Sequence, residues 1–294
     1  MKSVIILALF VACSSAKSLN PKQSPISTYG YLTKYAVPLA ESLKKAEEEI
    51  LRNRASRITG GSEAEEGQFP YQAGIISDIR NVFGIGVCGG SLIKADRVLT
   101  AAHCWWDGRN QAWRFTVVLG SNLLFSGGER IITTDVVTHP LWIPQLTFND
   151  IAMVRLPEPV ELSAKIATVS LPQGFDIFED FHLHTAIASG YGVKKDGGNI
   201  TETQNLSHVS MTVISNEVCD IAYLGNIHYS NLCTNTLGGS STCKGDTGGP
   251  LVVMRNGNPM LIGVSSYTVA LGCELGWPAV FSRITSFLNF INTN

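Results

Sequence analysis

The fold of this chain is indicated first by the stretch Cys243-Lys244-Gly245-Asp246-Thr247-Gly248-Gly249-Pro250. Glycines flank an acid and a hydroxyl residue there, and a proline leads into the apolar run 251–254. Such a tight turn brings one side chain and several backbone N–H groups to a single point, as an oxyanion hole requires. The stretch therefore predicts a turn that presents the hydroxyl of Thr247 beside backbone donors.

Two further stretches carry residues with matching chemistry. The first is Thr100-Ala101-Ala102-His103-Cys104, in which a histidine follows an apolar run and precedes a cysteine. A histidine so fixed suits a general base, although a lone histidine is more often structural. The second is Asn149-Asp150-Ile151-Ala152, in which an acid begins a run that should be a buried strand. A buried carboxylate needs a partner, and a histidine can supply it.

Together the three stretches resemble the active site of the trypsin/chymotrypsin-like serine protease family. The run Gly272-Cys273-Glu274-Leu275-Gly276-Trp277-Pro278 is similar to its invertebrate chymotrypsin- and collagenase-like branch. The resemblance implies an all-β fold of two six-stranded antiparallel barrels with a C-terminal helix. It also implies that Asp150 orients His103, that His103 deprotonates Thr247, and that the N–H groups of Gly245 and Thr247 form the oxyanion hole. The order His, Asp, hydroxyl is that of the chymotrypsin-like enzymes.

The same resemblance places Ser241 at the base of the primary specificity pocket and Thr268 and Ala279 on its walls. No acid is among these residues, so a preference for Arg or Lys is not expected. The bulk of Thr268 favours small or medium apolar side chains.

Arg57-Ile58-Thr59-Gly60-Gly61 is similar to the activation site of the family. Cutting after Arg57 by a trypsin-like protease would free the amine of Ile58, which the resemblance pairs with Asp246. A buried carboxylate beside the turn requires such a cationic partner. The expected organisation is a signal peptide over 1–16, a propeptide over 17–57 and a peptidase domain over 58–294.

The N-terminus has the pattern of a secretory signal: Lys2, a short apolar core over 4–13, and small residues before a cleavage point after Ala16. We therefore expect an extracellular protein. A net charge of −2 argues against binding to nucleic acid or to a membrane surface, and 28 glycines with 16% charged residues favour strands and loops over long helices. The expected partners are a polypeptide substrate or protein ligand, including a protease or a protease inhibitor. We expect a monomer without a cofactor.

Of the seven cysteines, Cys13 would be lost with the signal, which leaves an even number in an exported chain. Spacing alone leaves their connectivity open, and no CxxC pair supports a zinc site. The resemblance implies three disulfides: Cys88–Cys104, Cys219–Cys233 and Cys243–Cys273. Asn199 and Asn205 begin glycosylation sequons, or are unmodified surface asparagines.

The remaining pattern supports a strand-rich fold. Short β-type runs separated by glycine and polar turns are found at 90–93, 97–100, 115–119, 131–137, 151–156, 185–189, 209–214, 251–254, 261–265 and 280–283. Helices are expected after Ser215 and at the C-terminus, where Ile284, Phe287, Leu288 and Ile291 share a helical face. Apolar residues also recur at helical spacing over 39–50 among many charges. A solvated spacer is the favoured interpretation there, and a propeptide that covers the mature surface is the alternative.

Threonine at position 247, where the family usually has serine, makes the activity the open question. Its hydroxyl is retained, but the added methyl group restricts χ1 and needs space beside the base. The first hypothesis is a pseudoprotease that binds polypeptides or regulates another protease. The alternative is an active chymotrypsin- or elastase-like endopeptidase with Thr247 as its nucleophile.

Overall fold

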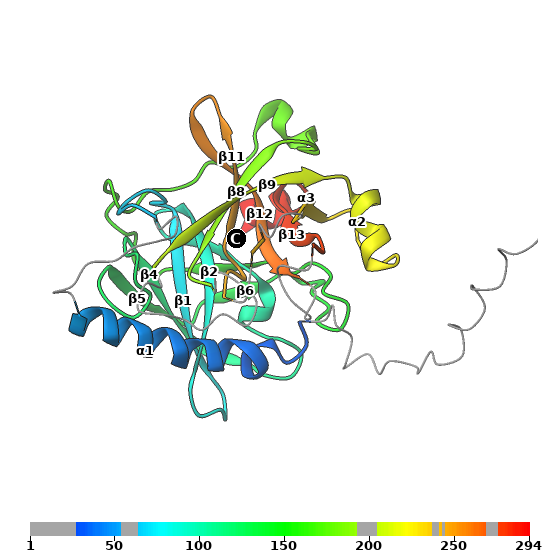
Figure 1. The fold of residues 1–294 in the computed structure, drawn as a ribbon. Coiled ribbons are helices and arrows are strands. Elements are labelled where there is room, and N and C mark those ends of the chain that lie inside the picture. Colours follow the sequence, from blue (N-terminus) through cyan, green and yellow to red (C-terminus); the bar gives the residue numbers. More distant parts are fainter. Residues whose placement is uncertain (1–27, 54–63, 193–204, 237–240, 243–244, 269–275) are drawn as a thin grey trace, which may run out of the picture.

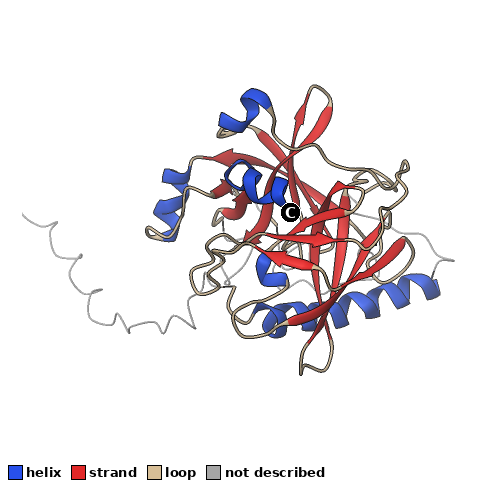
Figure 2. Ribbon diagram, turned by 180° about the vertical axis from the view of Figure 1, so that it is seen from behind, coloured by secondary structure: helices blue, strands red, loops and turns tan. Residues whose placement is uncertain are grey.

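The structure is a computed structural model that describes residues 28–53, 64–192, 205–236, 241–242, 245–268 and 276–294. It contains two antiparallel sheets, one built from the first half of the chain and one from the second (Figures 1 and 2). The strands of the first sheet are β1 (Gln72–Ile79), β2 (Ile85–Lys94), β3 (Arg97–Thr100), β4 (Ala112–Leu119), β5 (Glu129–Thr133), β6 (Val136–Thr138) and β7 (Ala152–Arg155). Those of the second are β8 (Thr185–Gly190), β9 (Ser207–Ile214), β10 (Asn231–Thr234), β11 (Pro250–Arg255), β12 (Asn258–Tyr267) and β13 (Ala279–Arg283).

The second sheet is a closed barrel in the order β10-β13-β12-β11-β8-β9. This confirms the prediction of a six-stranded antiparallel barrel. Its interior is filled by side chains that include Phe181, Leu251, Ile262 and Phe281, all of them fully buried. Closure pairs every strand on both sides and so leaves no exposed edge.

The first sheet has seven strands, in the order β5-β4-β1-β2-β3-β7-β6, where six were expected. The extra strand arises because the expected run 131–137 is broken at Thr134 and Asp135 into β5 and β6. β5 pairs with β4 at one edge, and β6 pairs with β7 at the other. Since only two residues separate β5 from β6, the backbone itself joins the two edges of the sheet, and a barrel-like enclosure results.

Two of the helices follow the sequence prediction closely. The helix α2 (Asn216–Tyr223) begins after Ser215, whose hydroxyl accepts a hydrogen bond from the Val218 N–H, and ends at Leu224 in a left-handed conformation. The helix α3 (Ile284–Thr293) buries Ile284, Phe287, Phe290 and Ile291, which lie on one face. Short 3₁₀ turns complete the described chain: η3 (Ala102–Cys104) and η4 (Gly174–Phe178).

The N-terminal helical stretch does not behave as a solvated spacer. It consists of the π-helical turn η2 (Leu32–Ala36) and the helix α1 (Val37–Asn53), and both contact β2 (Figure 1, blue). Leu32, Leu39 and Leu43 join the same buried apolar cluster as the first sheet. The favoured interpretation was wrong because the charges on α1, except for the buried Glu47, lie on its outward face, while its apolar face is covered by the sheet.

Among the described residues, none of the helices combines the length and the apolar composition that crossing a bilayer requires. The disulfides Cys88–Cys104 and Cys219–Cys233 are formed, as predicted. Cys243 and Cys273, the third predicted pair, lie outside the described residues.

Candidate active site

Strand pairing brings His103 and Asp150 together. β3 ends at Thr100 and β7 begins at Ala152, and these two residues are opposite each other in the antiparallel ladder. The residues after Thr100 and before Ala152 therefore emerge at the same end of the sheet. There the 3₁₀ turn η3 holds His103, and its neighbour Cys104 is fixed to β2 by the disulfide with Cys88.

The two side chains form a buried pair. His103 Nδ1 lies 2.7 Å from Asp150 Oδ2, and the His103 backbone N–H donates to Asp150 Oδ1 at 3.0 Å. The exposed fractions are 0% for His103 and 1% for Asp150, so water cannot replace either contact. With Nδ1–H directed at the carboxylate, Nε2 is left as the proton acceptor, which is the arrangement that a general base needs.

Two serines of the second barrel hold Asp150 in place. Ser266 Oγ, on β12, donates to Asp150 Oδ2 at 2.5 Å, and Ser282 Oγ, on β13, donates to the Asp150 backbone carbonyl at 2.7 Å. A buried carboxylate requires such donors. Sequence analysis missed both serines, because nothing in a single strand sequence indicates which serine faces the other barrel.

The turn that carries Thr247 is clamped between the two sheets. The Gly89 N–H of β2 donates to the Thr247 carbonyl at 2.7 Å, and the Gly248 N–H donates to the Ser265 carbonyl of β12 at 2.7 Å. Gly248 has φ of +83°, and a Cβ added there would lie 2.5 Å from the Gly89 carbonyl oxygen. Gly245, the predicted oxyanion donor, has φ of +101°. The glycines of the motif are thus required by backbone conformation and by close approach.

These findings agree with comparisons to known proteins. A protein-family model described as "Trypsin" matches residues 58–291. The chain belongs to the trypsin family. It is 37% identical over 249 residues to a collagenase of Hypoderma lineatum (83% of this chain, 90% of that protein) and 38% identical over 240 residues to a brachyurin of Leptuca pugilator (80% and 97%). A solved collagenase structure at 36% identity superposes with a TM-score of 0.72 over 81% of this chain and 98% of that one.

In this trypsin-family site, no hydrogen bond links the base His103 to the hydroxyl of Thr247. His103 Nε2 makes no hydrogen bond to any described residue, Thr247 included. Thr247 itself is 8% exposed. The pair His103–Asp150 is therefore assembled, whereas its link to the hydroxyl residue is not made.

An aromatic ring from the N-terminal stretch covers the histidine. The ring of Tyr31 meets that of His103 edge-on, with 4.6 Å between centroids. Burial raises the pKa of the Tyr31 phenol to about 12, an effect that the Thr247 side chain next to it partly offsets and that the Asp246 and Asp150 carboxylates reinforce. The phenol oxygen makes no regular hydrogen bond to a described residue. Tyr31 thus lies among the predicted site residues, and sequence analysis did not include it.

The predicted activation and specificity residues are only partly described. Arg57, Ile58 and Asn199 lie outside the described residues, so the cut, the amine–Asp246 pair and that sequon stay predictions. Asp246 Oδ1 accepts the Gly192 N–H at 2.9 Å. Ala279 begins β13 and is fully buried in the second barrel, and the half-buried Ser241 donates to the Thr242 carbonyl. Ser241 and Thr268 each adjoin a segment that the structure does not describe, and the pocket remains a prediction.

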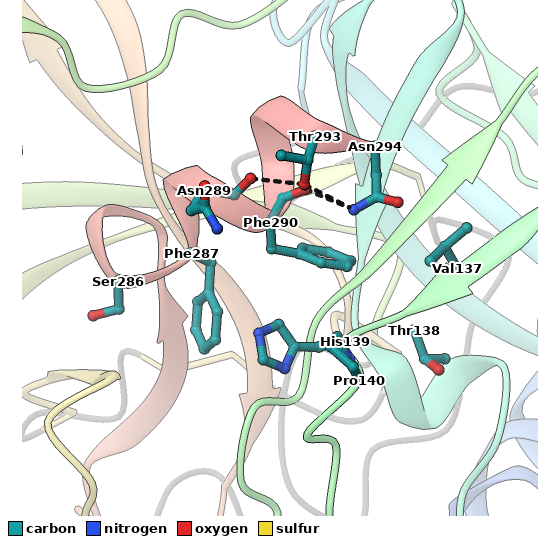
Figure 3. A pocket seen from close by; sticks show the side chains of 10 residues that line it. All are labelled: Val137, Thr138, His139, Pro140, Ser286, Phe287, Asn289, Phe290, Thr293 and Asn294. Carbon is teal, nitrogen blue, oxygen red and sulfur yellow. Dashed lines mark hydrogen bonds between the residues drawn. The ribbon is translucent and has the colours of Figure 1, made fainter.

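A separate pocket of about 450 Å³ lies between α3 and the segment after β6. Figure 3 shows the His139 ring between Phe287 and Phe290 in its lining. Burial lowers the pKa of His139, and its Nδ1 accepts the Leu141 N–H at 3.2 Å. These contacts fit a structural histidine that holds α3. In the described part of the chain, acidic, histidine and cysteine side chains form no cluster suited to a metal ion.

Proposed function

We propose that this chain is a secreted, polypeptide-binding protein of the trypsin family that cleaves peptide bonds much more slowly than the same fold with serine at position 247. The observation that carries the proposal is Thr247 itself, a β-branched residue on a turn clamped from both sides. Gly89 and Ser265 bond to the backbone of this turn, which leaves it little freedom to adjust. His103 Nε2 without a partner supports the same conclusion.

The expected loss follows from geometry. The methyl group of threonine restricts χ1 and must lie beside either the imidazole or the scissile carbonyl. A displacement of the reacting oxygen by ~1 Å costs ~10²-fold in rate, or ~2.7 kcal/mol. Full loss of one member of such a triad costs ~10⁶-fold, or ~8 kcal/mol. The activity of the native chain should fall between these limits.

The second candidate is a functional endopeptidase of chymotrypsin or elastase type. The intact network of His103, Asp150 and Ser266 favours it. In that reaction Thr247 Oγ1 would attack the carbonyl carbon and pass its proton to His103 Nε2, which later returns it to the leaving amine. The N–H groups of Gly245 and Thr247 would stabilise the oxyanion.

Both candidate functions predict the same ligand, the same processing protease and the same location for the protein. The ligand is a polypeptide with a small or medium apolar side chain, or a protease or protease inhibitor that presents one. A trypsin-like protease would cut the chain after Arg57, as the first step of activation. We propose that it acts outside the cell as a monomer.

The deciding experiment compares threonine and serine at position 247 in two chains that both carry Leu43→Asp, which undocks residues 28–53 so that neither Tyr31 nor Leu39 covers the site. Both are cut after Arg57, verified by an N-terminal sequence that begins at Ile58, and kcat/KM is measured on a peptide with an apolar P1 residue. Thr247→Ser should raise kcat/KM by at least ~10²-fold, because it removes one methyl group and leaves the hydroxyl. Adding His103→Ala should abolish the gain, because an unassisted serine is a weak nucleophile.

Equal rates for the threonine and serine forms would refute the slow-cleavage proposal and establish the endopeptidase. If the serine form remains inactive although it is correctly cut, Thr247 is not what limits cleavage. That result would also refute the proposal.

A further inference from the structure

The N-terminal segment, defined here as residues 28–53, packs against the body of the protein through one continuous apolar face. Its buried side chains repeat at helical spacing and are Leu32, Ala36, Leu39, Ala40, Leu43 and Ala46. The segment contacts β2, and all of these side chains except Ala46 belong to the apolar cluster of the first sheet. This surface of the sheet is therefore built to receive an amphipathic helix.

Two apolar side chains of the segment lie on the predicted catalytic residues. Tyr31 covers the His103 ring, as described above. Leu39 lies against Gly245, where an added Cβ would be 2.5 Å from Leu39 Cδ2. The segment thus occupies the space beside both the base and the oxyanion donor, which is where a bound polypeptide would lie.

Polar contacts fix the segment at its beginning. The Leu32 N–H donates to Asp107 Oδ2 at 2.8 Å, and the Gly30 N–H donates to the Asp107 carbonyl at 3.2 Å. Asn110 Nδ2 donates to Thr33 Oγ1 at 3.1 Å. Asp107 is fully buried and follows η3 closely in sequence, so this anchor lies beside the histidine turn.

A second polar anchor lies near the far end of α1. The Glu47 carboxylate accepts the backbone N–H groups of Leu124 and Phe125 at 2.6 and 2.8 Å. Glu47 is only 2% exposed. A buried carboxylate on two backbone donors is a specific contact that a loosely attached helix would not form.

We propose that residues 28–53 are an active-site plug that stays bound without a covalent link, so that cutting the chain after Arg57 does not by itself open the site. This rests on the proposed function, because it assigns the covered surface to polypeptide binding. The side chains and backbone groups through which the plug binds the body all precede Arg57, so the cut removes none of these contacts. The plug contains no cysteine, so only the backbone over 54–63 links it covalently to the body. Opening then requires a second event that undocks the helix.

The first arm of the test measures how well the plug covers His103 in the uncut full chain. Diethyl pyrocarbonate modifies accessible imidazoles, and peptide mapping by mass spectrometry reports His103 beside the exposed His182. In the native chain His103 should react far more slowly than His182. Leu43→Asp should accelerate the His103 reaction by more than ~10-fold, because it forces an unpaired charge against the sheet. Tyr31→Ala should accelerate it as well, whereas Lys34→Ala, on the exposed side of the same turn, should not.

The second arm measures retention of the plug. A site for a sequence-specific viral protease is placed within 54–63, the full chain is cut there, and size-exclusion fractions are examined by mass spectrometry. The native plug should co-elute with the body, and the Leu43→Asp plug should be lost. Free elution of the native plug, or a His103 that reacts as fast as His182 in the native chain, would overturn the proposal.

Neither arm depends on catalysis. A failure of the plug is therefore distinguishable from a failure of the proposed function, which is tested by the rates of the Thr247→Ser form.

Discussion

The contact between Glu47 and two backbone amides allows a quantitative prediction for Glu47→Ala. The truncation removes the carboxylate oxygens that accept the Leu124 and Phe125 N–H groups, which lie beneath α1 at 2.6 and 2.8 Å from the carboxylate. A buried donor left without a partner costs about 1–3 kcal/mol. Two such donors would cost about 2–6 kcal/mol if none of the loss were recovered.

One opposing contribution lowers this figure. Burial raises the pKa of Glu47, and the Leu124 and Phe125 amides and Arg130 only partly offset the rise. The ionised carboxylate is therefore held at some cost in the docked helix, and alanine removes that cost. We expect α1 to lose about 2–4 kcal/mol of docking free energy, the lower part of the range above. The population of the undocked helix should then rise roughly 30- to 700-fold, at a factor of ten for each ~1.4 kcal/mol.

Hydrogen exchange of the uncut chain, followed by mass spectrometry, measures this directly. Peptides that cover α1 should exchange faster in Glu47→Ala, and the amides of Leu124 and Phe125 should lose protection with them. Glu48→Ala is the matched control, since that side chain is 56% exposed and its partner Arg52 is 70% exposed. An exposed pair of this kind contributes at most about 1 kcal/mol.

Equal exchange in Glu47→Ala and Glu48→Ala would refute the reasoning. It would mean that the apolar face alone docks the helix and that the buried carboxylate contributes nothing to it.

Two other side chains permit direct tests. Ser266→Ala should lower the free energy of unfolding by about 1.5–3 kcal/mol, because a hydrogen bond to the buried Asp150 carboxylate is lost. Urea denaturation measures this free energy, and Ser210→Ala, at an exposed serine, is the control. His139 has a lowered pKa in the folded protein, so its contribution to stability is present above pH ~6.5 and is lost as the pH falls below that value. His139→Gln should therefore flatten the fall in Tm between about pH 6.5 and 5, while it retains an acceptor for the Leu141 N–H. An unchanged pH profile in that variant would contradict the assignment.

The local features of this chain could be predicted from the sequence because they depend on neighbouring residues. The cap of α2 at Ser215 and the buried face of α3 follow from helix periodicity and side-chain chemistry over a few residues. The tight turn around Thr247 could be predicted from its glycines, because glycine readily adopts positive φ, as Gly245 and Gly248 do.

The division of the first sheet could not be predicted in the same way. The run 131–137 contains one poor strand former, Asp135, which does not by itself show that the run divides. It breaks at Thr134 and Asp135, and its two halves pair with β4 and β7 on opposite edges of the sheet. The partner of a strand is set by residues far away in the sequence, and the composition of the strand itself does not specify that partner.

The sequence by itself determined that threonine stands at the hydroxyl position, and, through the resemblance of three short motifs to the trypsin family, it indicated the two-barrel fold and the pair His103–Asp150. Only the tertiary structure decided what surrounds that site. Ser266 reaches Asp150 from the other barrel across 116 residues of sequence, and Tyr31 reaches His103 from a helical segment that resembled a solvated spacer. An amphipathic pattern reports that a face will be buried, but not what buries it. Which element covers that face depends on how segments distant in sequence pack together. In this protein, that packing places the N-terminal segment over the candidate active site.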